Sequence, residues 1–273
     1  MRKNEYEQMP ILDKFLEEEP FLTPETFLSK DPENLVRKQL LASKGIDTCI
    51  LLFCSNQELK ARLQAKSEVF FELGTGSGHE NVLVYDNKVL LFFAQIGGPQ
   101  AVADIEELGY FGIKKFLCAG SCGLITKQEN DMLFLVEKAI RDEGASYHYL
   151  KPSLYVETDA ALTEKLSAML SLQHFAHKKV TTWTTDAFYR ESKSLIERRI
   201  QQGASTVEME CASYAAACKR KGLAFAQILY SSDAHTDDGQ WAWHIDKDRK
   251  KSILERLFDV CLLVATTKDE FDE

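Results

Sequence analysis

The sequence has few of the features that stabilise small secreted proteins or anchor a chain in a membrane. Its seven cysteines are odd in number and irregularly spaced, and the sequence contains no CxxC pair, which argues against a disulfide framework and a paired-cysteine zinc site. The N-terminus, MRKNEYEQMP, lacks the apolar core of a signal peptide, and the longest apolar stretch, around 89–96, is too short to span a bilayer. We therefore expect a cytoplasmic protein with buried, reduced thiols.

Basic residues are in the minority, which narrows the choice of partner. Lys and Arg total 33 against 42 Asp and Glu, so the formal net charge is -9 at pH 7. Phosphate backbones and anionic membranes attract clustered basic side chains, so we expect neither nucleic acid nor a membrane as partner. With 273 residues, 45% of them hydrophobic, the chain can bury a sizeable core around a small-molecule site.

Strand-like and helix-like segments alternate along the chain, which is typical of an α/β fold. The run 48–53 is continuously apolar and β-rich, as expected of a strand buried on both faces. Asp86-Asn87 between apolar runs predicts a hairpin, and Gly97-Gly98-Pro99 predicts the start of a helix that continues to Leu108. Further strands are predicted at 115–118, 180–183, 206–208 and 224–230, and helices at 33–43, 160–172, 209–221 and 248–266.

The predicted architecture is a single α/β domain over residues 33–273, with a central mixed, twisted β-sheet flanked by helices. Residues 1–32 carry four prolines and the acidic run Glu17-Glu18-Glu19, and we interpret them as an arm lying on the surface or on a neighbouring subunit. Ligands of such sheets bind beyond the carboxyl ends of the strands, so candidate residues are sought there.

Three predicted strand ends carry residues of the types that bind a ligand or act in catalysis. Each of the three has two interpretations. Gly120-Ser121-Cys122-Gly123 is expected to turn after the strand 115–118, either presenting N–H groups to an anion or linking two strands tightly. Glu208 and Glu210 lie at a strand-to-helix junction, where they accept hydrogen bonds from a ribose cis-diol or stabilise the helix dipole. Asp233 follows the strand 224–230 and is either a general acid or a turn residue.

Four stretches of the sequence form a set when they are taken in order. They are QIGGPQAVADIEELGYFGIKKFLCAGSCGLI (95–125), AIRDEGASYHYL (139–150), TTWTTDAFYRES (181–192) and VEMECASYAAACKRKGLAFAQILYSSDAH (207–235). Together they resemble the nucleoside phosphorylase family, which contains the uridine phosphorylases and the hexameric purine nucleoside phosphorylases. None is decisive alone, but all four occur in the family's order and spacing. The resemblance implies a homo-oligomer, either a dimer or a hexamer.

The resemblance also implies a role for each matching position. Ser121 and Gly123 match the residues that hold phosphate and C1 of the ribose, Phe188 matches the aromatic that stacks on the base, and Glu210 matches the carboxylate on the ribose hydroxyls. The full set implied to bind substrate is Gly98, Ser121, Gly123, Phe188, Glu208, Met209 and Glu210.

Asp233 matches the catalytic residue of the purine-specific members. In them an Asp protonates or hydrogen-bonds the imidazole-ring nitrogen of the leaving base, whereas uridine-specific members often lack it. The resemblance thus implies phosphorolysis of a ribonucleoside to free base and ribose 1-phosphate, with purine slightly favoured over uridine. Inorganic phosphate is the co-substrate, and neither a metal nor an organic cofactor is implied.

The residues at the positions expected to bind phosphate depart from the family pattern. The family's first strand ends in a Gly-Asp-Pro-like loop with a phosphate-binding arginine, where this chain has CSNQE (54–58), and a second arginine position is Cys118. Candidates to bind phosphate are therefore Ser121, Arg141, His148 and Arg190. Two alternatives stay open, a nucleosidase that uses water and a non-catalytic nucleoside-binding sensor.

Overall fold

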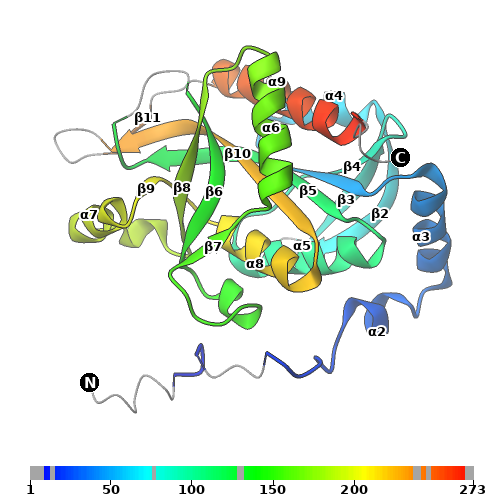
Figure 1. Ribbon diagram of the computed structural model, residues 1–273. Coiled ribbons are helices and arrows are strands. Elements are labelled where there is room, and N and C mark those ends of the chain that lie inside the picture. Colours follow the sequence, from blue (N-terminus) through cyan, green and yellow to red (C-terminus); the bar gives the residue numbers. More distant parts are fainter. Residues whose placement is uncertain are drawn as a thin grey trace.

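The computed structural model describes residues 9–12, 16–75, 78–127, 132–235, 241–243 and 247–267. One 11-stranded sheet runs through the molecule in the order β11-β10-β6-β8-β9-β5-β1-β4-β3-β2, with β7 beside β6 (Figure 1). The predicted single α/β domain with a mixed sheet is confirmed. The strands are β1 (Thr48–Leu52), β2 (Ser67–Thr75), β3 (Gly78–Tyr85), β4 (Val89–Phe92), β5 (Lys115–Leu124), β6 (Leu133–Asp142), β7 (Tyr155–Glu157), β8 (His177–Thr185), β9 (Ala204–Glu208), β10 (Ala224–His235) and β11 (Trp241–Trp243).

Part of this sheet closes on itself. Strand β10 pairs with β6 on one side and with β5 on the other, so β5, β10, β6, β8 and β9 form a closed ring. Strand β1 pairs in parallel with β5 and carries β4, β3 and β2 beyond it. Strands β5 and β9 pair antiparallel only over their last residues, so their carboxyl ends meet at one place.

Helices cover both faces of the sheet (Figure 1). Helices α5 and α8 share one apolar cluster, α4, α6 and α9 share a second, and α7 packs into a third. In the described part of the chain no helix is long and apolar enough to cross a membrane. The helices are α2 (Pro24–Leu28), α3 (Pro32–Lys44), α4 (Gln57–Gln64), α5 (Gly98–Tyr110), α6 (Ala160–Leu172), α7 (Lys193–Gln201), α8 (Cys211–Lys221) and α9 (Lys247–Thr266), with single 3₁₀ turns η1 (Ala145–His148) and η2 (Phe188–Arg190).

Several elements have the boundaries that the sequence predicts. Helix α6 spans residues 160–172 as predicted, and Asp159 caps it by accepting the Leu162 N–H at 2.8 Å. The hairpin between β3 and β4 turns at Asp86 and Asn87, whose φ angles of 50° and 54° are those of a two-residue turn. The interactions that define these two elements lie within a few residues of each other in the sequence.

Strands β5, β8, β9 and β10 are longer than predicted, and the corrections to β5 and β10 concern the site. Strand β5 does not turn after Cys118 but continues through Gly120–Gly123 to Leu124, so the predicted turn is wrong. The backbone of this segment is paired with β9 and β10, which holds it extended. Strand β10 likewise continues to His235, so Asp233 lies in a strand beside a pairing irregularity and not in a turn. Strands β2, β6, β7 and β11 and helices α2, α4 and α7 were not predicted.

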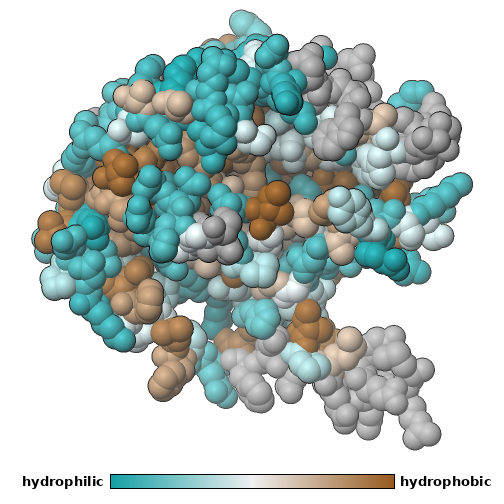
Figure 2. Space-filling view, turned by 180° about the vertical axis from the view of Figure 1, so that it is seen from behind, coloured by the Kyte–Doolittle hydropathy of each residue, from teal (hydrophilic) through white to brown (hydrophobic). Residues whose placement is uncertain are grey.

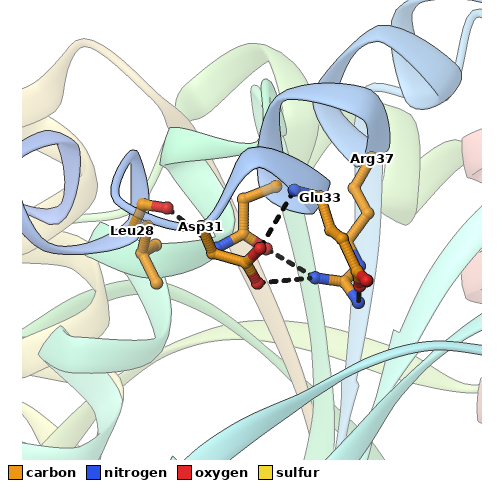
Figure 3. Close-up of polar contacts among 5 residues, drawn as sticks. Leu28, Asp31, Glu33 and Arg37 are labelled. Carbon is orange, nitrogen blue, oxygen red and sulfur yellow. Dashed lines mark hydrogen bonds and ion pairs between the residues drawn. The ribbon is translucent and has the colours of Figure 1, made fainter.

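Helix α3 connects the N-terminal segment to the α/β domain. Asp31 caps this helix by accepting the Glu33 N–H at 3.0 Å, and the Arg37 guanidinium bridges Asp31 at 3.5 Å and Glu33 at 2.8 Å (Figure 3). Asn34 Nδ2 donates to the Leu28 carbonyl at 2.9 Å, which ties α2 to α3. Helix α2 itself has no buried residue. The interpretation of residues 1–32 as an arm stays a prediction.

Candidate active site

The candidate site is built around Gly123 of β5. Gly123 is the pairing partner of Asp233 in β10 and of Val207 in β9, the residue before Glu208. A Cβ at Gly123 would lie 2.9 Å from the Trp241 ring and 3.1 Å from Val207 Cγ1, so a side chain there would displace the Trp241 ring. The strand ends therefore bring the predicted ribose segment and the predicted acid to opposite sides of one glycine.

Glu208 uses both of its oxygens inside the protein. Its Oε1 accepts the Thr184 hydroxyl at 2.6 Å, and its Oε2 accepts the N–H groups of Glu210 at 2.8 Å and Cys211 at 2.7 Å. These N–H groups begin α8 and have no partner within the helix, so Glu208 supplies their acceptor. Burial raises the pKa of Glu208, and its three hydrogen bonds oppose that rise. Of the two interpretations, the contacts favour support of the helix end over ribose binding.

Glu210 lies two residues further on, facing the start of α5. Its Oε1 accepts the Gly97 N–H at 2.7 Å, and the side chain is buried. Burial, then repulsion from Glu208, raises the pKa of Glu210, and the bond from Gly97 opposes the rise. Met209 is half-buried between the two carboxylates. A donor or a cation that approaches such a buried carboxylate favours its ionised form.

Glu143 is a third buried carboxylate, which sequence reasoning missed. Its Oε2 accepts the Ser213 hydroxyl at 2.8 Å and the Ser146 N–H at 2.9 Å, while its Oε1 is buried without a hydrogen-bond partner among the described residues. Gly98 lies against this group, since a Cβ there would be 2.6 Å from Ser213 Oγ and 3.4 Å from Glu143 Oε2. The only available signal was the place of Glu143 inside the matching stretch 139–150.

Asp233, on the other side of Gly123, is half-buried. The Ser232 hydroxyl donates to its Oδ1 at 2.5 Å. Glu191, which sequence reasoning also missed, follows η2, and burial together with repulsion from Asp233 raises the pKa of Glu191 to about 7. Two carboxyl groups that repel each other at this end can retain a proton near neutral pH.

Phe188 stands three residues before Glu191, at the start of η2. Its side chain is 50% exposed, and its ring lies 4.0 Å from that of Tyr189 at an interplanar angle of 41°. An exposed ring on a short turn is free to stack on a flat ligand. Through Glu191 this turn is electrostatically coupled to Asp233, so the aromatic and the acid belong to the same end of the site.

Neutral groups occupy the end of β5 where phosphate is expected. Ser121 is exposed, and its side chain is hydrogen-bonded to the hydroxyl of Tyr230, its pairing partner on β10. Burial raises the pKa of Tyr230 to about 12, so this hydroxyl keeps its proton. Burial, with repulsion from Glu210 and Glu208, raises the pKa of Cys118 well above its ordinary value. None of these three groups supplies a positive charge.

The candidate replacements for the missing arginines lie in different settings. His148, at the end of η1, and Arg190, at the end of η2, are exposed. Arg141 is buried, and four of its five N–H donors are used by the segment that follows β6. It therefore organises that segment. Its acceptors are Ser146 Oγ at 2.8 Å, the Lys151 carbonyl at 2.7 Å, Ser153 Oγ at 2.8 Å and the Leu150 carbonyl at 3.1 Å.

Residues 49–263 match the family model of the phosphorylase superfamily. Among solved structures, the fold is similar to that of purine nucleoside phosphorylase from Toxoplasma gondii in complex with immucillin-H. The TM-score is 0.67 and the sequence identity 19%, over 81% of this chain and 90% of that one. At this identity the likeness concerns the fold alone.

Curated relatives include phosphorylases and a nucleosidase. The chain is 32% identical to guanosine phosphorylase from Halorubrum lacusprofundi over 130 residues, which is 47% of this chain and 54% of that protein. It is 31% identical to uridine phosphorylase from Salmonella typhimurium over 151 residues, 50% of this chain and 59% of that protein. It is 26% identical to aminodeoxyfutalosine nucleosidase from Helicobacter pylori over 195 residues, 67% and 84% respectively. The chain thus spans little more than half the length of these two phosphorylases.

Proposed function

The chain belongs to the phosphorylase superfamily, as the four matching stretches predict, and we propose that it cleaves the N-glycosidic bond of a ribonucleoside, preferring a purine base. The observation that carries the proposal is the convergence at Gly123, which has Asp233 on one side and the segment ending in Glu210 on the other. Cleavage of this bond needs a negative group beside the sugar and a proton source beside the base. The two sides of Gly123 supply these groups.

On the ribose side the acting group is Glu210. Glu208 is fixed by three internal hydrogen bonds, so it holds the first turn of α8 and thereby the backbone of Glu210. As the bond breaks, the ribose acquires oxocarbenium character, and a buried carboxylate attracts that charge more strongly than an exposed one does. Ribose hydroxyls that donate to Glu210 also favour its ionised form.

On the base side Phe188 stacks on the ring and Asp233 assists its departure. The Ser232 hydroxyl occupies Asp233 Oδ1, which orients the carboxyl group. Protonation of the imidazole-ring nitrogen makes a purine a better leaving group, and acid assistance of this kind contributes roughly a hundredfold to ten-thousandfold. A pyrimidine has no such nitrogen, which supports the preference for purines.

Phosphate is the first candidate for the group that captures the sugar. In this case Ser121 and the adjacent β5 backbone hold the anion, and the products are free base and ribose 1-phosphate. The guanosine and uridine phosphorylases among the relatives support this candidate. Arg190 is then the candidate cation for it and His148 a candidate donor, because Arg141 uses four of its five N–H donors elsewhere.

Water is the second candidate, and the charges of the site support it. Cys118 is a neutral thiol where the family has an arginine, and Glu143, Glu208 and Glu210 are all buried. A phosphate dianion is repelled by such carboxylates, whereas water is not. The nucleosidase relative supports the same candidate.

A nucleoside panel tests the proposal. Inosine, guanosine, adenosine and uridine are each incubated with the full-length chain, with and without phosphate, and base and sugar products are separated by chromatography. We expect base release, faster from the purine nucleosides. Ribose 1-phosphate formed only with phosphate identifies a phosphorylase, and free ribose formed without phosphate identifies a nucleosidase. If no nucleoside is cleaved but one binds in calorimetry, the enzymatic proposal fails and the sensor alternative replaces it.

A further inference from the structure

The indole ring of Trp241, on β11, lies against the glycine at the centre of the candidate site. Its Cη2 and Cζ3 atoms are 2.9 and 3.1 Å from the position that a Cβ of Gly123 would occupy. The missing side chain of Gly123 lets the ring approach this closely. The edge of the six-membered ring thus meets strand β5, while 40% of the residue remains exposed.

Strand pairing places Trp241 on the same face of the sheet as Asp233. Strand β11 runs antiparallel to the end of β10, with Trp243 opposite Asp233 and Trp241 opposite His235 (Figure 1). Side chains opposite each other in an antiparallel pair share a face, and residues two apart on one strand share it too. Gly123, the partner of Asp233 on β5, is therefore contacted by the ring from the face that carries the proposed acid.

An exposed apolar side chain is ordinary in itself, and the position of Trp241 is what sets it apart. Seen from behind, separate apolar groups interrupt a largely hydrophilic surface (Figure 2). Tryptophan is highly buried on average, however, and a ring that only covered Gly123 would be enclosed by its neighbours. The exposed part of the Trp241 ring can contact a ligand that lies beside Asp233.

We infer that Trp241 determines the specificity for the base, because its indole forms an aromatic wall on which the leaving base stacks beside Asp233. This inference rests on the proposed function and adds a residue to it. Phe188, half of whose surface is exposed, supplies a second ring at the same end of the site. A base held between aromatic groups keeps its ring plane fixed relative to the carboxyl group of Asp233.

Such a wall selects the base by its size. A purine has two fused rings and a pyrimidine has one, so a purine covers more of the indole. Stacking on an aromatic side chain depends little on the identity of the base, because every base has a π-face. Trp241 should therefore favour purines over uracil and discriminate little among the purines.

The first measurement is kcat/KM for inosine, adenosine and uridine in the parent, Trp241→Phe and Trp241→Leu. Phenylalanine keeps an aromatic ring, whereas leucine keeps only an apolar side chain beside Gly123. The matched control is Phe27→Leu, which removes an exposed ring on α2. We expect Trp241→Leu to lower kcat/KM for both purine nucleosides roughly five- to a hundredfold, as for one base stacked on one aromatic ring, and for uridine less. Trp241→Phe should lose less, and the control should match the parent.

The second measurement does not depend on turnover. The chain is labelled with fluorotryptophan, and the fluorine NMR signal of Trp241 is identified by its absence from the spectrum of Trp241→Phe. Hypoxanthine and adenine have no glycosidic bond to cleave. Each should shift this signal in the parent chain, and uracil should shift it less.

Two results would overturn the inference in a parent chain that cleaves purine nucleosides. One is a folded Trp241→Leu variant with the parental preference for purine nucleosides over uridine. The other is a Trp241 signal that stays in place at saturating hypoxanthine, which decides the matter even if Trp241→Leu does not fold. Either result would mean that the ring only covers Gly123. A parent chain that cleaves no nucleoside refutes the proposed function itself, and the inference with it, before any variant is made.

Discussion

Asp104 is a buried carboxyl group in the middle of α5 whose charge opposes folding. Its Oδ1 accepts from Gln100 Nε2 at 2.8 Å, and its Oδ2 accepts from the Tyr214 hydroxyl at 3.4 Å. Burial raises the pKa of Asp104 to about 7, from an ordinary value of about 4. The folded protein therefore keeps a proton that the unfolded chain releases. The associated stability is complete below about pH 4 and is lost as the pH rises to about 7.

Asp104→Asn removes this ionisation with little change of shape. The amide oxygen can accept from Gln100, and the amide nitrogen can donate to the Tyr214 oxygen. A shift of about three pKa units corresponds to on the order of 4 kcal/mol, since one unit is about 1.4 kcal/mol. Because Asp104 is only 1% exposed, no discount for solvent screening applies. Relative to the parent, we expect the variant to gain on the order of 4 kcal/mol between pH 4 and pH 8.

The measurement is equilibrium urea unfolding of the parent, Asp104→Asn and a control, Glu197→Gln, at several pH values in this range. Glu197 is an exposed glutamate on α7, so its substitution should leave the difference from the parent constant. For Asp104→Asn the difference should grow with pH up to about 7 and then level off. A difference that is the same at pH 4 and pH 8 would refute the reasoning, because it would mean that Asp104 titrates alike in both states.

Three further substitutions test the candidate site. Glu210→Gln keeps the shape but weakens acceptance from the ribose hydroxyls, a loss of about 1.5–3 kcal/mol, so kcat/KM should fall roughly tenfold or more without a lower melting temperature. An unchanged kcat/KM would make Glu210 a helix-end residue only. Asp233→Asn cannot deliver a proton, so purine nucleoside cleavage should fall on the order of a hundredfold, uridine cleavage less, and the pH–rate profile should lose its alkaline limb. Parental purine rates with the same profile would remove Asp233 from the mechanism. Gly98→Ala brings a Cβ to 2.6 Å from Ser213 Oγ, so melting temperature and turnover should fall, and Ser213→Ala in the same chain should restore part of both. If the Gly98→Ala variant has the melting temperature and turnover of the parent, the close packing of Gly98 against Ser213 is not needed.

Elements that depend on neighbouring residues could be predicted from the sequence. Helix α6 has an N-cap aspartate one residue before its first apolar position, and that pair of signals defines its start. The Asp86-Asn87 turn needs two residues that tolerate positive φ, and Asn and Asp are among those that do. In both cases the deciding interactions lie within a few residues.

Strand β5 shows where local reasoning fails. Two glycines within four residues are typical of a turn, yet Gly120–Gly123 is extended. Its backbone groups are paired with β9 and β10, which come from distant parts of the chain. No pattern inside 115–124 contains that information. The closed ring, which depends on the double pairing of β10, was unpredictable for the same reason.

The resemblance located the candidate site, but it did not show which residue has which role there. Glu208 and Glu210 are the same residue type two positions apart, and both interpretations suited both. The folded structure distinguishes their roles, because the Thr184 hydroxyl and the Cys211 N–H donate hydrogen bonds to the carboxylate of Glu208. Arg141 appeared able to bind phosphate, although its donors hold carbonyl groups that only the folded segment brings near. Sequence gives the residue type, and the fold decides which donors and acceptors remain.

The burial of carboxylates at the candidate site is itself an argument for function. Burial raises the pKa of Glu208 and Glu210 and so costs stability at neutral pH, and Glu143 leaves one buried oxygen without a hydrogen bond among the described residues. Glu208 offsets part of this cost by holding the first turn of α8, whereas the charge of Glu210 and the unpaired oxygen of Glu143 give the fold nothing comparable. A cation-like transition state beside these carboxylates is stabilised. The same charges repel an anionic nucleophile, so bond breaking and phosphate capture make opposite electrostatic demands on one pocket. The dependence of base release on phosphate therefore measures how this site balances the two demands.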